Sequence, residues 1–129
     1  MCLSCVKSTD ALAFEELGEF SQPELDKLPV GVIELDPSGH VRSYNQREIE
    51  YSGLSRERVL GKQFFTEVAP CTRVAEFFGR FERMVQQPKA KRESLDFVFA
   101  FADGERMASI MMNWDPGRER VTLIIDVVD

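Results

Sequence analysis

The C-terminal part of the chain most constrains the fold, because it has the pattern of consecutive strands joined by tight turns. Residues 93–102 alternate between apolar side chains and smaller or polar ones, with the period of two that is typical of a half-buried strand. The side chains expected to face the core are Leu95, Phe97, Phe99 and Phe101. Asp103-Gly104 predicts a two-residue hairpin turn. Residues 106–114 and, after a turn at 115–117, residues 121–128 return as further strands, which predicts an antiparallel meander.

Two earlier strands and one helix complete the expected architecture. Residues 30–36 are a predicted buried strand, and residues 41–44 return as its hairpin partner after the turn at 36–39. Residues 74–85 carry apolar side chains at helical spacing. The predicted apolar stripe consists of Val74, Phe77, Phe78, Phe81 and Val85. We therefore expect an α+β fold with a five-stranded antiparallel sheet flanked by helices, and this order of elements resembles that of PAS domains.

The stretch between these elements, residues 45–73, contains no long periodic segment. Gly53, Gly61 and Pro70 divide it into short pieces that are compatible with single helical turns. Long irregular segments are uncommon in compact domains unless they build a site. We therefore expect the functional site to draw on this stretch.

Residues 1–29 are expected to form a helical leader, followed by one domain over residues 30–129. Residues 10–18 have a capping aspartate, apolar side chains at helical spacing and a terminal glycine. Ser21 is then the expected cap of a second short turn through residues 23–26. Helices this short are not stable alone, so the leader must dock on the domain if it is to be ordered.

The composition excludes several classes of partner. With 16 basic and 22 acidic residues the net charge is −6, which argues against nucleic acid or an anionic membrane as partner. Lys89, Lys91 and Arg92 form only a short basic patch in a predicted loop. The sequence contains no apolar run of the roughly 20 residues that span a bilayer and no signal-peptide pattern. We expect a cytoplasmic protein that is a monomer or a weak dimer.

The sequence favours neither a metal site nor an enzyme. Cys2 and Cys5 form an isolated C-x-x-C pair, and His40 is the only histidine, so the ligands for structural zinc are missing. Common catalytic signatures are absent. A Cys–His nucleophile could only combine Cys71 with His40, and His40 lies in a predicted hairpin turn. We therefore expect no catalytic residues.

Two motifs carry a resemblance to a known family. The first is Y-N-Q-R-E at residues 44–48, and the second is G-K-Q-F-F-T-E-V-A-P-C-T at residues 61–72. From about Leu28 onward the chain resembles the photoactive yellow proteins, a family of PAS-domain blue-light sensors that carry p-coumaric acid (4-hydroxycinnamic acid) as a cysteine thioester. The resemblance implies that Cys71 carries this chromophore.

The resemblance also assigns roles to other residues. Tyr44 and Glu48 are expected to donate hydrogen bonds to the chromophore's phenolate oxygen, and Ser52 to support the Tyr44 hydroxyl. The residues expected to line the chromophore pocket are Ile33, Leu54, Phe64, Val68, Ala69, Pro70 and Phe99. The Cys71 backbone N–H is expected to bind the thioester carbonyl.

Elementary electrostatics explains why such a pocket needs these donors. A phenol has a pKa of about 10, and burial alone raises it because a low dielectric disfavours the charged form. A phenolate therefore needs strong hydrogen bonds at neutral pH. Glu48 can donate one only if its carboxyl group is protonated, which is expected for a desolvated carboxyl beside an anion.

For signalling, the resemblance implies that light isomerises the chromophore from trans to cis and that Glu48 then gives its proton to the phenolate. An unpaired buried carboxylate costs several kcal/mol, against a total domain stability of about 5–15 kcal/mol. The least stable part of the fold is expected to open first. That part is the leader, residues 1–29, which would then bind an unidentified downstream signalling protein.

Two departures from the family pattern are visible. Leu54 stands where the family commonly has an arginine over the pocket, which predicts altered colour or recovery. Residues 101–104 lack a family methionine that contacts the chromophore, which predicts slower dark recovery.

Three alternatives stay open from the sequence. The first is a PAS module that binds a non-covalent ligand or only dimerises. The second is a cysteine-dependent enzyme. The third is a redox sensor that uses Cys2, Cys5 and Cys71.

Overall fold

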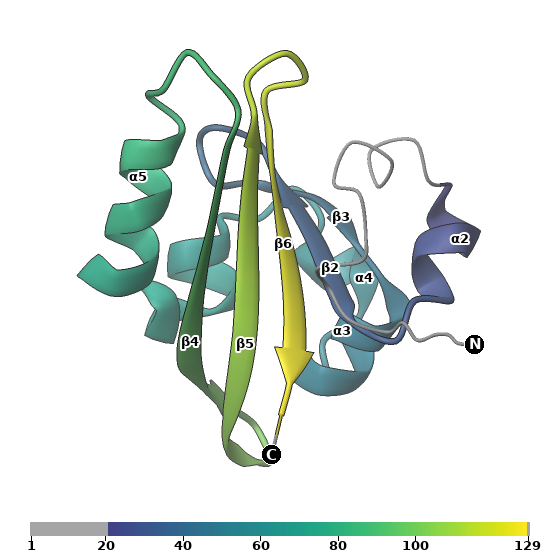
Figure 1. Ribbon diagram of the computed structural model, residues 1–129. Coiled ribbons are helices and arrows are strands. Elements are labelled where there is room, and N and C mark those ends of the chain that lie inside the picture. The colour runs from purple at the N-terminus through teal and green to yellow at the C-terminus, as the bar shows by residue number, and fades with distance from the viewer. Residues whose placement is uncertain (1–20, 129) are drawn as a thin grey trace, which may run out of the picture.

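The computed structural model describes residues 21–128 and contains a five-stranded antiparallel sheet (Figure 1). Its strands are β2 (Gly31–Leu35), β3 (Val41–Tyr44), β4 (Lys91–Phe101), β5 (Gly104–Asp115) and β6 (Arg120–Val127). Their spatial order is β3-β2-β6-β5-β4, so the last strand of the chain lies between the first hairpin and the second. This arrangement confirms the predicted α+β fold with its two N-terminal and three C-terminal strands.

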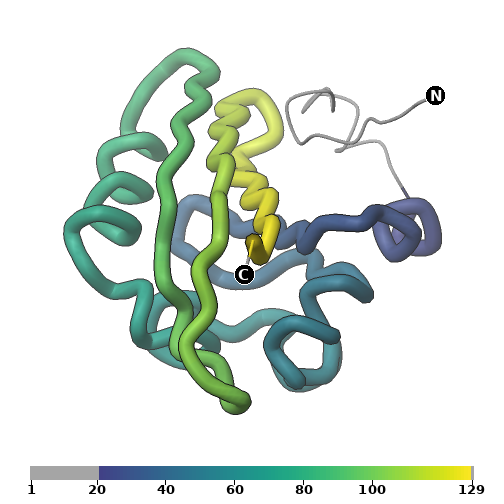
Figure 2. Tube along the Cα trace, turned by 60° about the horizontal axis from the view of Figure 1, so that its bottom comes forward, coloured from purple at the N-terminus to yellow at the C-terminus, as the bar shows by residue number. Residues whose placement is uncertain are grey.

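The helices that follow β3 gather on one face of this sheet, as Figures 1 and 2 show. The α-helices are α2 (Gln22–Asp26), α3 (Gln46–Ser52), α4 (Arg56–Val59) and α5 (Arg80–Met84). Two π-helical turns, η2 (Phe64–Val68) and η4 (Ala75–Gly79), and one 3-10 turn, η3 (Pro70–Thr72), complete the described part of the chain. The stretch from residue 45 to residue 73 therefore consists of short helical pieces, as expected. Of these helices, α2 is drawn at the right edge of Figure 1, away from the helices that cover the core.

Two details of the predicted elements are wrong. The helix expected over residues 74–85 begins as the π-helical turn η4 and continues as α5, so its apolar face is not a regular stripe. Val74 is 42% exposed, whereas Met84, which the stripe left out, is buried. Hydrogen bonds from i to i+5 widen the turn and shift the register of the buried face. The β4–β5 turn consists of Ala102 and Asp103, one residue earlier than expected, and Gly104 with φ 126° opens β5.

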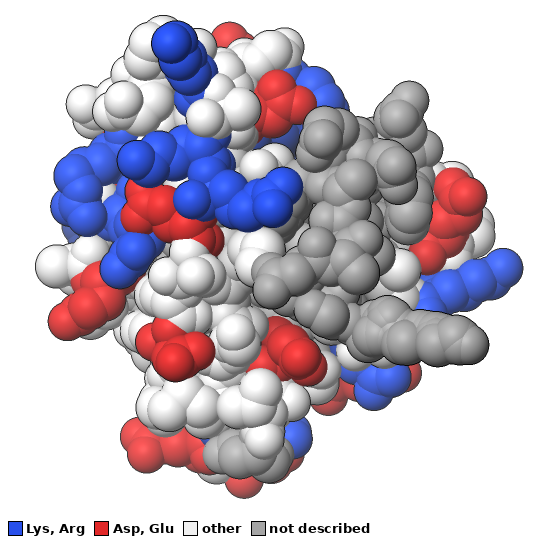
Figure 3. All heavy atoms as spheres, viewed as in Figure 1, with Lys and Arg blue, Asp and Glu red and all other residues white. Residues whose placement is uncertain are grey.

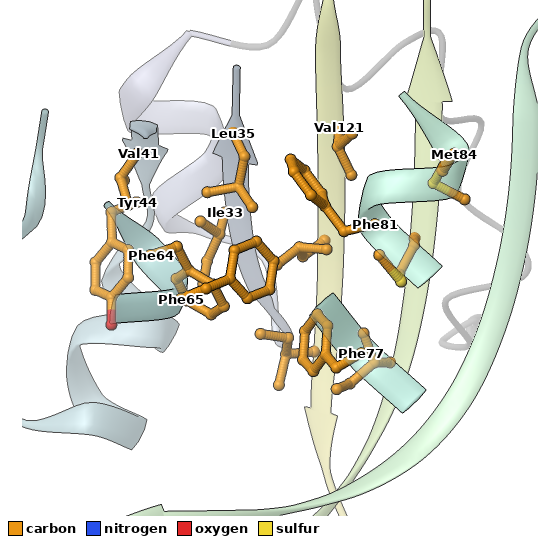
Figure 4. Close-up of a cluster of buried hydrophobic side chains, with 14 of the residues drawn as sticks. Ile33, Leu35, Val41, Tyr44, Phe64, Phe65, Phe77, Phe81, Met84 and Val121 are labelled. Atoms are coloured by element: carbon orange, nitrogen blue, oxygen red, sulfur yellow. The ribbon is translucent and has the colours of Figure 1, made fainter. Parts of the chain in front are cut away.

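A core rich in phenylalanine fills the space between the sheet and the helices (Figure 4). The Phe65 ring lies 5.1 Å from the Phe64 ring, 5.7 Å from the Phe77 ring and 4.9 Å from the Phe81 ring, measured between centroids. These tilted and edge-on contacts are the arrangements that aromatic rings favour. They hold η2 against η4 and α5. Tyr44 lies at the edge of the same cluster, beside Phe64.

A second, smaller cluster lies on the opposite face of the sheet. It consists of Leu25, Val30, Val32 and Ile124, with Leu28 and Met111 half-buried against it. Side chains alternate between the two faces of a strand, so Val32 and its neighbour Ile33 belong to different clusters. The turn α2, capped by Ser21 as expected, therefore docks on the outer face through Leu25. Residues 1–20, with Cys2, Cys5 and the helix expected at 10–18, lie outside the described residues.

One buried side chain, that of Asn45, joins α2, β2 and α3. Its Oδ1 accepts hydrogen bonds from the backbone N–H groups of Val32 at 2.8 Å and Glu48 at 3.1 Å. Its Nδ2 donates to the carbonyl oxygens of Leu25 and Val30, both at 2.9 Å. Asn45 is thus the N-cap of α3 and also the point at which α2 is tied to the sheet.

Asp26 and Arg56 make a second link to α2. Asp26 Oδ1 accepts from the backbone N–H of Gln46 at 2.8 Å and pairs with Arg56 Nη2 at 2.7 Å. Arg56 Nε in turn donates to the carbonyl oxygen of Tyr44 at 2.8 Å. The last residue of β3 and the end of α2 are therefore held by the same guanidinium group.

Figure 3 shows charged side chains of both signs on the side of the molecule that carries β4, β5 and β6. Basic side chains gather over the side of α5 and β4, around acidic ones. One such pair joins Arg80 Nη1 and Glu93 Oε1 at 2.9 Å. Within residues 21–128, no helix is long and apolar enough to cross a bilayer, and no group of three or more acidic, histidine or cysteine side chains could hold a metal ion.

Replacing Asn45 with alanine should destabilise the protein strongly. Asn45→Ala removes four hydrogen bonds to buried backbone groups of α2, β2, α3 and Val30, which we expect to cost about 3 kcal/mol or more. Denaturant unfolding measures the loss, with Asn113→Ala in β5 as a control at a half-buried asparagine. Equal losses in the two variants would show that the Asn45 side chain does not hold these elements together.

Candidate functional site

The site is a cavity of about 350 Å³ between the irregular stretch and β4. This size falls within the range of roughly 300–1,000 Å³ that is common for small-molecule sites. Its lining consists of Tyr44, Glu48, Ser52, Leu54, Phe64, Val68, Ala69, Pro70, Cys71, Phe99, Ala100, Phe101 and Ala102. The polar side chains come from β3 and α3, the thiol from η3, and most of the apolar side chains from η2 and β4.

All but one of the side chains expected at the site line this cavity. The exception is Ile33, which is fully buried in the core cluster instead. Its strand β2 lies inside the sheet, between β3 and β6, so its inward side chains are covered by the core. Ile33 is therefore not among the residues that line this cavity, and its expected contact with a bound chromophore stays a prediction.

The lining also includes residues at the end of β4 that the sequence reasoning left out. The ring of Phe101 stacks on that of Phe99, with centroids 5.2 Å apart and planes 16° apart. The resemblance assigned Phe99 to the pocket, and the alternation places Phe101 on the same face of the strand, so the two signals together could have found Phe101. Ala100 and Ala102 carry no comparable signal, because a small side chain beside a turn is common in any hairpin.

Tyr44 and Ser52 form a hydrogen-bonded pair at the wall of the cavity. The Tyr44 hydroxyl donates to Ser52 Oγ at 2.8 Å, and the Leu54 backbone N–H donates to the same oxygen at 3.1 Å. Burial, together with the nearby Glu48 carboxyl, raises the pKa of Tyr44 well above its ordinary value, although the Ser52 contact lowers it in part. Tyr44 therefore keeps its proton at neutral pH and can act as a hydrogen-bond donor.

Glu48 is the unusual group of the site, because it is an ionisable side chain with only 3% of its surface exposed. Burial raises the pKa of Glu48 from its ordinary value of 4.5 to about 8, and the Tyr44 hydroxyl offsets only part of this effect. Glu48 Oε1 is buried without a hydrogen-bond partner among the described residues. Buried polar atoms are almost always paired. Glu48 is therefore a neutral acid at neutral pH that retains hydrogen-bonding capacity.

Cys71 lies on a short turn that the neighbouring backbone fixes. Thr72 is buried, its Oγ1 donates to the Ala69 carbonyl oxygen at 2.6 Å, and its N–H donates to the same oxygen at 2.9 Å. The Arg73 N–H donates to the Pro70 carbonyl oxygen at 3.1 Å. Cys71 itself is half-buried, forms no disulfide and lines the cavity. Its thiol can therefore form a covalent bond to a group held inside.

The geometry does not support a cysteine-dependent enzyme that uses the only histidine. His40 Nδ1 faces Asp36 Oδ1 at 3.7 Å, and the His40 backbone bridges to Gln63. His40 is not among the residues that line the cavity of Cys71. A base for thiol catalysis is therefore not supplied by this histidine.

Together these residues can hold a small, mainly apolar group that carries an acceptor oxygen. Phenylalanine and aliphatic side chains cover most of the cavity wall. The Tyr44 hydroxyl and the protonated Glu48 carboxyl can both donate to one oxygen, and hydrogen bonds to a charged oxygen are the strong kind. A thiol in the same cavity allows such a group to be covalently attached.

Comparison with known proteins identifies the family of the chain. A family model for the PAS fold matches residues 25–123, so the chain belongs to the PAS domains. Within them it belongs to the photoactive yellow protein family. It is 31% identical to the photoactive yellow protein of Rhodobacter capsulatus over 91 residues. This match covers 70% of this chain and 73% of that protein.

Two further relatives support the same family. The photoactive yellow protein of Halochromatium salexigens is 45% identical over 69 residues, which is 54% of this chain and 55% of that protein. The match thus spans only about half the length of that relative. The solved photoactive yellow protein domain of the sensor histidine kinase Ppr from Rhodospirillum centenum has a TM-score of 0.81 at 37% identity, and it covers 86% of this chain and 96% of that domain.

The buried carboxyl group predicts a specific dependence of stability on pH. Between pH 4.5 and about 8 the folded protein holds the Glu48 proton that the unfolded chain releases. The folded state therefore binds more protons in this window, and the free energy of unfolding falls as pH rises, by at most about 1.4 kcal/mol per pH unit. Glu48→Gln should remove this contribution.

Denaturant unfolding of the chromophore-free protein at several pH values within that window measures the effect. Glu50→Gln, on the exposed side of the same helix, is the matched control and should keep the wild-type slope. Parallel pH profiles for wild type and Glu48→Gln would contradict a neutral buried Glu48.

Proposed function

We propose that the protein is a blue-light photoreceptor that carries a p-coumaroyl group as a thioester on Cys71. The observation that carries this proposal is Glu48, a buried acid that lines the same cavity as a free thiol and the Tyr44 hydroxyl. The relatives that bear the name photoactive yellow protein support it. The proposed role is sensory, and no residue is assigned a catalytic function.

When bound, this group supplies the absorption of visible light and a double bond whose trans–cis isomerisation moves its phenolic end. Cys71 Sγ loses its proton and bonds to the carbonyl carbon of an activated p-coumaric acid, whose activating group leaves. Tyr44 and Glu48 donate hydrogen bonds to the phenolate oxygen. The Tyr44 hydroxyl has a single hydrogen, so when it donates to the phenolate oxygen the Ser52 hydroxyl donates to Tyr44 across the same 2.8 Å contact and keeps it oriented.

The apolar side chains that line the cavity exclude water from the phenolate. Phe64, Val68 and Phe99 cover the cavity, and Ala69 and Pro70 lead into the attachment site. Leu54 lines the cavity where the family commonly has an arginine. An apolar side chain at this position shields the phenolate end without adding a cation. We therefore propose that Leu54 tunes the colour or the dark recovery relative to relatives that carry the arginine.

The signal arises when Glu48 gives its proton to the phenolic oxygen and becomes a carboxylate. Within residues 21–128, the carboxylates in ion pairs are those of Asp26, Glu34, Asp36, Glu50 and Glu93, and Glu48 is not among them. A buried charge without a partner costs several kcal/mol, which is a large part of a stability of about 5–15 kcal/mol. The charge therefore favours opening of the parts of the fold that are bound nearest to it.

The hydrogen bonds around α3 point to α2 as the part that opens. The Glu48 backbone N–H is bound to Asn45 Oδ1, and Asn45 Nδ2 holds the Leu25 carbonyl of α2. Arg56 holds both Tyr44 O and the Asp26 carboxylate. A displacement of α3 that admits water to Glu48 loosens these bonds. We propose that light in this way releases the leader, residues 1–29, to an unidentified signalling partner.

Reconstitution with activated p-coumaric acid tests the attachment. The wild-type protein should gain the mass of one p-coumaroyl group and a strong absorption band in the blue that bleaches under light. Cys71→Ala should gain neither, because it lacks the thiol. A Cys2→Ala/Cys5→Ala variant is the matched control and should behave as wild type. A wild-type protein that stays colourless and gains no mass would overturn the proposal and favour a PAS module with a non-covalent ligand.

Replacement of Glu48 in the reconstituted protein tests the signal. Glu48→Gln should still bind the group, because glutamine can donate a hydrogen bond, yet it cannot transfer a proton. Hydrogen exchange of the amides in α2 (Gln22–Asp26) should accelerate under illumination in wild type and much less in Glu48→Gln.

Glu50→Gln, which removes an exposed carboxylate from the same helix, should retain the full response. Equal acceleration in wild type and Glu48→Gln would show that opening does not depend on the buried charge.

A further inference from the structure

Gly31 occupies a position where the backbone does not require a glycine. It lies in β2, pairs with Ile125 of β6 and is absent from the glycines with a positive φ. Glycine weakens the interior of a strand, because it adds no packing and costs more conformational entropy. A glycine there often marks a close approach by another group.

The group that approaches Gly31 is the Glu48 carboxyl. A Cβ added to Gly31 would overlap Glu48 Oε1, lie 3.2 Å from Glu48 Cδ and lie 3.4 Å from Cδ2 of Tyr51. The space that a side chain would occupy at residue 31 is therefore filled by the end of the Glu48 side chain. The oxygen that rests there is the same Oε1 that has no hydrogen-bond partner.

Neither element is free to move apart and make room. Asn45 Oδ1 accepts from the backbone N–H of Val32 at 2.8 Å and from that of Glu48 at 3.1 Å. Val32 is the next residue after Gly31, so this one oxygen fixes the spacing between β2 and α3 at the point of contact. A methyl group at residue 31 must therefore displace the carboxyl itself.

We propose that Gly31 is a positioning residue, whose missing side chain forms the seat that aims the Glu48 carboxyl into the cavity. The seat holds Oε1 against β2 and leaves Oε2 as the oxygen that faces the bound group. This inference rests on the proposed function in one respect only, namely that the group that Oε2 faces is the bound chromophore. The seat itself concerns two residues of the chain and can be tested without a chromophore.

The first test is a double-mutant cycle on the chromophore-free protein. Gly31→Ala should lower the unfolding midpoint in denaturant clearly in the wild-type background. In the Glu48→Ala background, where the colliding carboxyl is gone, the same substitution should lower the midpoint by less than a third as much. Gly79→Ala in η4 is the control, because an added Cβ there meets nothing closer than 3.6 Å.

The double-mutant cycle is informative even if a variant does not fold. If Gly31→Ala does not fold but Gly31→Ala/Glu48→Ala does, the collision is the cause and the proposal is supported. Equal losses in the two backgrounds, or loss of folding in both, would mean that glycine is needed for another reason and would overturn the proposal.

The second test uses the reconstituted protein and separates this inference from the proposed function. Gly31→Ala should shift the absorption band and the pH at which the bound phenol ionises, whereas Gly79→Ala should leave both unchanged. An unchanged absorption band in Gly31→Ala would show that Gly31 does not orient the Glu48 carboxyl toward the bound group. If no variant gains a band, the proposed function fails, and the cycle alone decides whether Gly31 seats the Glu48 carboxyl.

Discussion

The burial of one carboxyl group, that of Glu48, is the constraint on which the site depends. Desolvation raises its pKa to about 8, so the group stays neutral and can donate a hydrogen bond. The same desolvation makes its charged form expensive. One physical effect therefore serves both parts of the proposed cycle, because it stabilises the dark state through a neutral donor and penalises the state that follows proton loss.

The surrounding fold maintains this burial. Asn45 caps α3 and fixes it to β2, so that the Glu48 carboxyl comes to rest on Gly31. The same asparagine holds the carbonyl of Leu25, and Arg56 joins Tyr44 to Asp26. The contacts that keep water from Glu48 are thus also the contacts that dock α2. The proposed signal uses these hydrogen bonds to connect the site to α2.

The sequence predicted what depends on local pattern. The alternation through Phe97 and Phe99 located β4. The motifs at 44–48 and 61–72 contain most of the residues that line the cavity, because residues close in sequence within an irregular segment can line the same site. Ile33 lies in the core cluster and not in the cavity lining, because a strand pattern does not say which neighbours cover an inward side chain. The contact between Gly31 and Glu48 joins two elements through long-range packing, so no periodicity or motif could reveal it.

The most direct measurement of the central claim is a pH titration of the Glu48 side-chain carboxyl carbon by NMR in the chromophore-free protein. Glu48→Gln assigns the signal by its disappearance. The account predicts a midpoint near pH 8, because burial disfavours the carboxylate. A midpoint near the ordinary value of 4.5 would mean that Glu48 is charged at neutral pH, and it would contradict both the neutral donor and the costly buried charge.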